Sequence, residues 1–242
     1  MKKTGSRIAH ETGVTTLIMG AALLACTTSA SAATLPVSSY DMINGAASTP
    51  GLSLRDDTYA GGTGNPGENY STLAGGKGDL TDGLIATSNW NITPAEFVGW
   101  SQIYVRNPEI TFHFAQVMDI ADVSIHMNWG YSASSVDFSV DRTTWINRVI
   151  NLPDPPTGAN FQAGFAGLGL TGDTLVIRLN DRSPFYWNSS LLSADWILIS
   201  EVSIEGSLAP IPEPTVTSLL LAGIGVVCFA ARRRVRPGIL PG

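Results

Sequence analysis

The chain is poor in charged residues, in cysteine and in histidine. Charged residues make up 14% of its 242 positions, well below the roughly 25% of an average protein. Acidic residues outnumber basic ones by 20 to 14. This composition excludes a coiled coil, a charged disordered tail and a basic nucleic-acid-binding protein. We therefore expect no nucleic acid among its partners.

The middle of the chain also lacks the groups that most catalytic sites use. Its two cysteines, Cys26 and Cys228, lie near the two ends, so no disulfide or thiol nucleophile is available between them. Only His113 and His126 remain there, and no Gly-x-Ser-x-Gly, His-Glu-x-x-His or phosphate-binding loop occurs. We predict that the protein is not an enzyme and has no catalytic residues.

The N-terminus has the pattern of an export signal. It opens with three basic residues, Lys2, Lys3 and Arg7. An apolar run at 14–25 follows, and then the small residues Ala30-Ser31-Ala32. This order predicts a signal peptide over residues 1–32, a helix that is removed after Ala32. A retained membrane anchor and lipidation at Cys26 are the two alternatives.

The C-terminus combines a short motif, an apolar run and arginines. Pro212, Glu213 and Pro214 precede the apolar residues 215–231, and Arg232-Arg233-Arg234 follow. A helix over 215–231 would be roughly 25 Å long, slightly less than a hydrocarbon core of ~30 Å. We expect a transmembrane helix there, with the arginines on the cytoplasmic side. A plain anchor explains the apolar run and the arginines, but it does not explain the Pro-Glu-Pro motif.

The order of these three parts resembles the PEP-CTERM sorting signal of Gram-negative bacteria, here over residues 209–242. The resemblance implies processing by an exosortase, a membrane enzyme. It also implies that the C-terminal helix anchors the chain in the inner membrane before processing. The implied destination is the cell surface or an extracellular matrix such as that of a biofilm.

The body of the chain shows the alternation of β-strands. Apolar and polar residues alternate over 110–114, 123–127 and 136–140, and further apolar strands are expected at 175–179 and 196–204. No long segment has a helical period. The sequence therefore predicts an all-β domain over residues 33–208, built as a β-sandwich.

One segment of the body, residues 60–83, differs from the rest because it contains eight glycines and few apolar residues. It is either a flexible surface loop or a loop that some tether holds in place. Glu201 lies within an apolar strand, where a carboxylate is costly unless it is paired or bound to a cation. Calcium could bind there. The alternative is that Asp82 caps a turn and Glu201 pairs with an arginine such as Arg178.

The spacing Asp79-x-x-Asp82-Gly83, followed by Thr87 and Trp90, resembles the calcium loop of discoidin (F5/8 type C) domains and family 32 carbohydrate-binding modules. Segments 97–112, 139–145 and 196–206 resemble later strands of that fold, a galactose-binding-like jelly-roll β-sandwich. The resemblance implies a structural Ca²⁺ ion. Its ligands would be side-chain oxygens of Asp82 and Glu201, an oxygen of Thr87, and the backbone carbonyls of Asp79 and Leu84.

A sugar-binding site is expected where aromatic faces and a few polar groups meet on loops. The candidates are His126, Trp129, Tyr131, Arg182, Tyr186 and Trp187. Trp145 lies next to a strand and is expected to pack in the core. The sequence thus predicts an exported surface or matrix protein with a calcium-stabilised domain that binds polysaccharide. A structural matrix protein without a sugar ligand is the alternative, and a glycan hydrolase is the third hypothesis.

Overall fold

The computed structural model describes residues 32–49, 51–152, 160–180, 185–187, 190–192 and 196–210. The predicted signal helix, the Pro212-Glu213-Pro214 motif and the predicted C-terminal helix lie outside these residues. Within the described ranges, no helix combines the length and hydropathy needed to cross a membrane.

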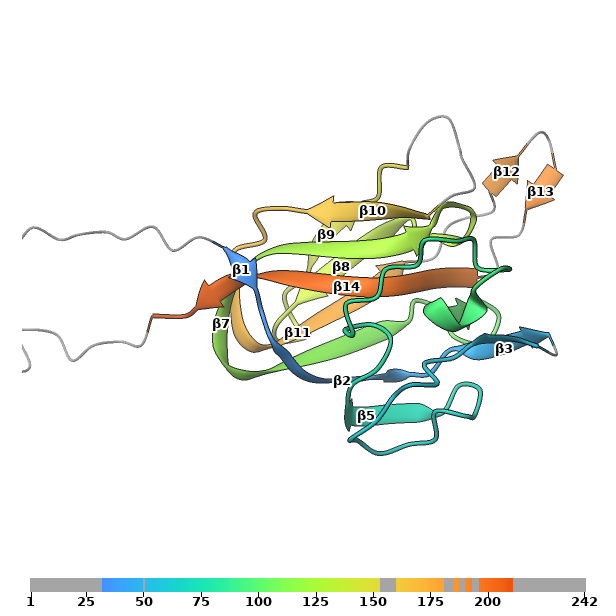
Figure 1. The fold of residues 1–242 in the computed structure, drawn as a ribbon. Coiled ribbons are helices and arrows are strands. Elements are labelled where there is room, and N and C mark those ends of the chain that lie inside the picture. Colours follow the sequence, from blue (N-terminus) through green and yellow to red (C-terminus); the bar gives the residue numbers. More distant parts are fainter. Residues whose placement is uncertain are drawn as a thin grey trace, which may run out of the picture. The chain divides into compact units, whose positions relative to one another are not determined.

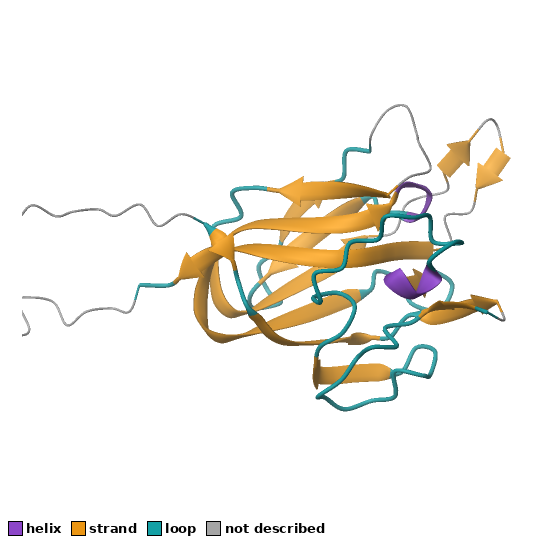
Figure 2. Cartoon of the chain, viewed as in Figure 1, coloured by secondary structure: helices purple, strands orange, loops and turns teal. Residues whose placement is uncertain are grey.

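Among the described residues the regular structure is almost all strand, with two short 3₁₀ helices, η1 (Pro94–Glu96) and η2 (Trp129–Tyr131) (Figures 1 and 2). The early strands are β1 (Ala33–Thr34), β2 (Val37–Ile43), β3 (Ala46–Thr49), β4 (Leu52–Leu54), β5 (Thr72–Gly76) and β6 (Val98–Ser101). The later strands are β7 (Glu109–Asn128), β8 (Ser135–Ser139), β9 (Ile146–Val149), β10 (Asn160–Phe165), β11 (Leu170–Asn180), β12 (Phe185–Trp187), β13 (Ser190–Leu192) and β14 (Trp196–Leu208).

Strand β7 is 20 residues long and belongs to both layers of the sandwich. Its first limb, residues 109–114, lies between β2 and β11. Its second limb, residues 118–128, pairs with β14 on one side, and on the other with the start of β11 at 118–120 and with β10 at 123–128. Residues 115–117 are exposed at the bend, where Figure 1 shows the strand turning back. Strands β5, β8 and β9 extend the first layer, and β1 and β6 extend the second.

Alternation along β7 places its apolar side chains between the layers. Phe112 on the first limb and Ile125 on the second are fully buried, because successive side chains of a strand point to opposite faces. The domain is therefore an all-β sandwich, as the alternation predicted. The strands expected at 110–114 and 123–127 are two limbs of one strand, since the backbone stays extended through the bend.

Trp145 is not in the core, contrary to expectation. Strand β8 ends at Ser139 and β9 begins at Ile146, so Trp145 belongs to the turn between them. Its indole N–H donates to the carbonyl of Arg142 over 3.1 Å, and the Arg178 guanidinium lies 3.9 Å from its ring centroid. The ring therefore packs against a cation at the surface of the first layer.

The central position of Phe112 leads to a stability prediction. The variant Phe112→Ala removes a fully buried ring from the first limb of β7 and should lower the free energy of unfolding by about 3–5 kcal/mol. Val149→Ala, at a side chain that is 68% exposed, is the matched control and should change stability by less than about 0.5 kcal/mol. Urea unfolding of the two variants measures the difference. Equal stability of the two variants would show that the core does not lie at β7.

Candidate functional site

The glycine-rich segment is held in place by buried polar groups of the protein. Asp56 is fully buried, and its carboxylate accepts hydrogen bonds from the Tyr40 hydroxyl and, over 3.0 Å, from the backbone N–H of Asp79. Gly78 lies so close to this carboxylate that a Cβ atom there would be 2.0 Å from Asp56 Oδ1. Backbone pairing between Ala60 and Lys77 closes the segment. The segment is therefore tethered at its base.

We call residues 79–87 the acidic loop. They include the end of the glycine-rich segment and the four residues after it, and they lie against β14. The backbone N–H of Gly83 donates to Oε2 of Glu201 over 3.2 Å, and the N–H of Val202 donates to the carbonyl of Leu80 over 2.9 Å. Gly83 has a φ of +83°, which a residue without a Cβ adopts readily. The loop and the buried glutamate are thus in direct contact.

The alternative reading of these residues is half correct. Asp82 does cap a turn, because its Oδ1 accepts the N–H of Leu84 over 2.8 Å. Glu201 does not pair with Arg178, which donates instead to Glu109 over 2.7 and 2.8 Å. The reason is the register of the sheet, in which Arg178 on β11 lies directly opposite Glu109 on β7.

Burial raises the pKa of two carboxyl groups at the loop. The pKa of Glu201, which is 6% exposed, is about 8, because burial and the charge of Asp82 outweigh the hydrogen bond from Gly83. The pKa of Asp79 is about 7, from burial and from the charges of Asp56, Asp57 and Asp82, partly offset by the Thr58 hydroxyl. Ionisation of these two groups is therefore costly in the protein alone, and a cation at the loop would offset that cost.

The acidic loop also contains polar atoms without partners. Asp79 Oδ2 and Thr81 Oγ1 are buried and have no hydrogen-bond partner among the described residues. Hard oxygens of this kind are the ligands that Ca²⁺ takes. In the described part of the chain, however, no three His, Cys, Asp or Glu side chains converge as a metal site. Backbone carbonyls and Thr87 would have to complete the coordination, so the loop fits calcium and not a metal that requires side-chain ligands alone.

The predicted metal ligands have different surroundings in the structure. Asp82 lies close enough to both Asp79 and Glu201 for its charge to raise their pKa values. The side chains of Leu84 and Thr87 are exposed on the outer part of the loop, where Leu84 was expected to contribute only its carbonyl. The Asp79 carboxylate, by contrast, accepts a hydrogen bond from Thr58. Its backbone and not its side chain is the part expected to reach an ion.

An aromatic pocket lies near the loop end of the sandwich. Its volume is about 70 Å³, and its walls are Leu54, Trp90, Tyr131, Trp196 and Leu198. Trp90 and Tyr131 meet edge to face, with ring centroids 5.4 Å apart and an interplanar angle of 83°. Of these three aromatic residues, only Tyr131 is a sugar-binding candidate in the sequence. Trp90 belongs to the pattern of the calcium loop, and Trp196 begins a predicted strand. Only the fold brings the three rings together.

The other predicted sugar-binding residues have different surroundings. Trp129 is 7% exposed and is part of the packed interior. His126 is half-buried on the outward face of β7, and burial lowers its pKa. Arg182 lies outside the described residues. Tyr186 and Trp187 belong to β12, which pairs with β13, and the structure describes only their backbone.

Comparison with protein families identifies the class of domain. A family model for the DS-like domain of discoidin domain-containing receptors 1 and 2 matches residues 36–206, and a model of the PEP-CTERM protein-sorting motif matches residues 210–234. The sandwich is therefore a discoidin-type domain. The chain belongs to the DS-like domain family and has a PEP-CTERM motif at its C-terminus, which confirms both resemblances and implies export to a surface or extracellular location.

Comparison with solved structures finds chains of low sequence identity and low TM-score. Truncated AlyQ with CBM32 and alginate lyase domains is 14% identical, with a TM-score of 0.38, 76% of this chain covered and only 35% of that one. The module CpGH89CBM32-6 from Clostridium perfringens is 18% identical, with a TM-score of 0.32, covering 53% and 83%. The F5/8 type C domain of a Bacteroides fragilis protein is 13% identical, with a TM-score of 0.34, covering 54% and 80%. The comparison with curated proteins finds no match.

The raised pKa values of Asp79 and Glu201 predict a pH dependence for the calcium-free chain. Both groups keep a proton up to about pH 7 and 8 in the folded state, whereas in the unfolded chain they release it near pH ~4. The free energy of unfolding therefore falls as the pH rises through this window. We expect the melting temperature without calcium to drop by about 5 °C between about pH 5 and about pH 8, followed by circular dichroism.

The variant Glu201→Gln is the control for this titration. Its amide oxygen can still accept the hydrogen bond from Gly83, but the side chain cannot ionise. The variant should therefore show a flatter pH dependence than the native chain. A native melting temperature that stays level or rises over the same range would contradict the prediction.

Proposed function

We propose that the protein is sorted by an exosortase to the cell surface or extracellular matrix of a Gram-negative bacterium, where its discoidin-type domain binds polysaccharide. The observation that carries the sugar-binding proposal is the grouping of the Trp90, Tyr131 and Trp196 rings around the aromatic pocket. Its volume of about 70 Å³ is smaller than a whole-sugar site, so the rings would contact one face or edge of a sugar residue. Aromatic faces of this kind stack on the apolar C–H faces of sugar rings. The role is binding and not catalysis, in keeping with the lack of catalytic motifs in the sequence.

The sorting part of the proposal rests on the C-terminal motif. Residues 210–234 match the PEP-CTERM motif, and the apolar run at 215–231 is at the lower limit of length for a helix that holds the chain in the inner membrane before processing. An exosortase is the partner that such a motif implies. The acidic body would then be released or displayed outside the membrane.

Calcium is the proposed structural cofactor of the acidic loop. The ion would supply positive charge at the contact between the loop and β14, and it would need no proton on the carboxylates there. Asp82 and Glu201 would bind through side-chain oxygens, with Thr87 and the carbonyls of Asp79 and Leu84 completing the set. The buried carboxyl group of Glu201, which lies within the field of Asp82, supports this proposal, because a cation would offset the cost of ionising it there.

Removal of calcium tests the cofactor. At pH 7.5 a chelator should lower the melting temperature of the full chain by several degrees, because it leaves Glu201 and Asp82 facing each other without a cation. The variant Asp82→Ala should melt at the same temperature with and without chelator. Asp57→Ala, at an exposed aspartate outside the acidic loop, should keep the sensitivity to chelator. A native melting curve unaffected by chelator would remove calcium from the proposal.

A glycan array with the full chain tests the sugar-binding function, and the variant Tyr131→Ala tests the pocket. The variant should weaken binding of the selected glycan about tenfold, since it removes one aromatic wall worth ~1 kcal/mol or slightly more. Tyr104→Ala removes a tyrosine that is 73% exposed and not part of this pocket, so it should bind normally. Absence of binding to any glycan, with calcium present, would favour the structural matrix protein instead.

A further inference from the structure

A second pocket lies on the outer side of the first layer. It has a volume of about 370 Å³ and is lined by β2, the start of β5, the start of β7, the loop before β7 and the turn between β8 and β9. We call it the polar pocket, and its charged lining residues are Asp41, Arg106, Glu109 and Arg142. Its volume falls within the range of roughly 300–1,000 Å³ that small-molecule sites occupy.

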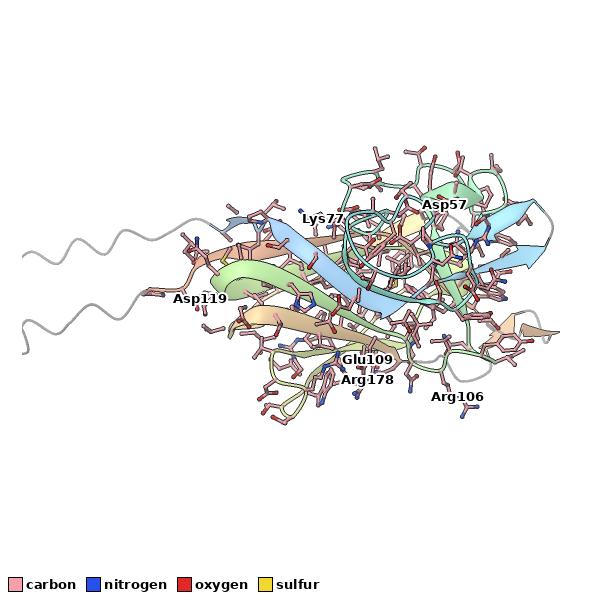
Figure 3. The ribbon with its side chains drawn as sticks, turned by 90° about the horizontal axis from the view of Figure 1, so that it is seen from below. Asp57, Lys77, Arg106, Glu109, Asp119 and Arg178 are labelled. Atoms are coloured by element: carbon pink, nitrogen blue, oxygen red, sulfur yellow. The ribbon has the colours of Figure 1, made fainter. Side chains whose placement is uncertain are left out.

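Glu109, which lines the pocket, is held by two arginines, Arg142 in the lining and Arg178 beside it. Glu109 accepts hydrogen bonds from Arg142 over 2.6 Å and from Arg178 over 2.7 and 2.8 Å. Figure 3 shows Glu109 and Arg178 together, with Arg106 nearby on the same side of the ribbon and directed away from it. The guanidinium groups of Arg142 and Arg178 therefore share one carboxylate. Glu109 has little capacity to neutralise a third positive charge, that of Arg106.

The arginine of the turn is rigidly positioned. Arg142 has a φ of +59°, which non-glycine residues seldom adopt. Its backbone N–H donates to Ser139 Oγ over 2.9 Å, and Asp141 Oδ1 accepts the N–H groups of Thr143 and Thr144, each over 2.8 Å. This turn directs the Arg142 side chain across the sheet to Glu109 and to the Thr111 hydroxyl, 2.6 Å away.

Several arginine donors remain available in the polar pocket. A guanidinium carries five N–H donors, and Arg142 uses one on Glu109 and one on Thr111. Arg106 is exposed and forms no ion pair with any described residue. The apolar residues of the lining are Met42, Ile43, Val105 and Pro108, of which Ile43 is 42% exposed.

Charge distribution makes this place unusual in the molecule. The body between residues 33 and 211 has 18 acidic residues and only 7 basic ones, so most of its surface repels anions. Three of the seven basic residues, Arg106, Arg142 and Arg178, nevertheless gather at or beside one pocket. The two acids that line the pocket are already paired, Asp41 with His113 and Glu109 with Arg142 and Arg178. Arg106 has no ion pair with a described residue, so it is the group to which an anion would be attracted.

We propose that the polar pocket binds a carboxylated sugar residue of an acidic polysaccharide. The carboxylate pairs with Arg106 and the free donors of Arg142, because a guanidinium matches the planar geometry of a carboxylate. The apolar face of the sugar ring packs on Ile43 and Val105. This inference rests on the proposed glycan-binding function and names the class of glycan, at a site separate from the aromatic pocket.

Calorimetric titration of the full chain with three probes tests the inference. The probes are trigalacturonate, its neutral methyl ester and dextran sulfate, all in the presence of calcium. We expect trigalacturonate to bind and its ester to bind at least tenfold more weakly. Binding should weaken as salt is added, because exposed charges are screened.

Arg106→Ala is the decisive variant, since an exposed side chain without an ion pair can be removed without disturbing the fold. It should weaken trigalacturonate binding about tenfold or more. Arg148→Ala is the matched control, because it removes the same charge from β9 at a position that does not line the pocket. An equal effect of the two variants would overturn the inference, as would stronger, Arg106-dependent binding of dextran sulfate.

The test separates this inference from the function on which it rests. If neutral glycans bind and lose affinity in Tyr131→Ala, but trigalacturonate binds no more tightly than its ester, only the polar-pocket inference is wrong. If a glycan array and all three probes show no binding, the proposed glycan-binding function itself is wrong.

Discussion

The bend of β7 is the constraint on which the arrangement of the domain depends. One strand supplies the centre of both layers, and side chains of both limbs, such as Phe112 and Ile125, belong to one buried cluster that holds the two sheets together. A shift of one residue in β7 would turn every apolar side chain outward. Glu109 begins this strand and Glu201 pairs with its second limb. The polar pocket and the contact of the acidic loop with β14 therefore both depend on the position of β7.

The acidic loop shows how a segment with little apolar content becomes ordered. Its base is held by the buried carboxylate of Asp56, which receives the Tyr40 hydroxyl and the backbone of Asp79. Its tip lacks such compensation, since Glu201 and Asp79 have raised pKa values and Asp79 keeps an unpaired oxygen. Protein groups therefore stabilise the base, and the proposed ion would stabilise the tip. The acidic loop would then be ordered in two ways, by hydrogen bonds within the protein at its base and by the proposed ion at its tip.

Local patterns in the sequence predicted the strands but not their partners. Alternation around Phe112 and Ile125 reports the direction of side chains, which has a period of two and needs no tertiary information. The contact between Gly83 and Glu201 joins residues 118 positions apart, and only resemblance to a family indicated it. The alternative in which Arg178 pairs with Glu201 was wrong because the register of the sheet places Arg178 opposite Glu109. The aromatic pocket was missed since Trp90 and Trp196 come from distant segments.

Strand β14 runs from the aromatic pocket towards the C-terminal segment of the chain. It begins at Trp196 in the aromatic pocket and ends at Leu208, just before the PEP-CTERM motif at 210–234. A mechanical load between a bound ligand and an anchored C-terminus would run along this strand. Its pairs with β7, from Ile199 to Leu208, would then be loaded in shear and resist together.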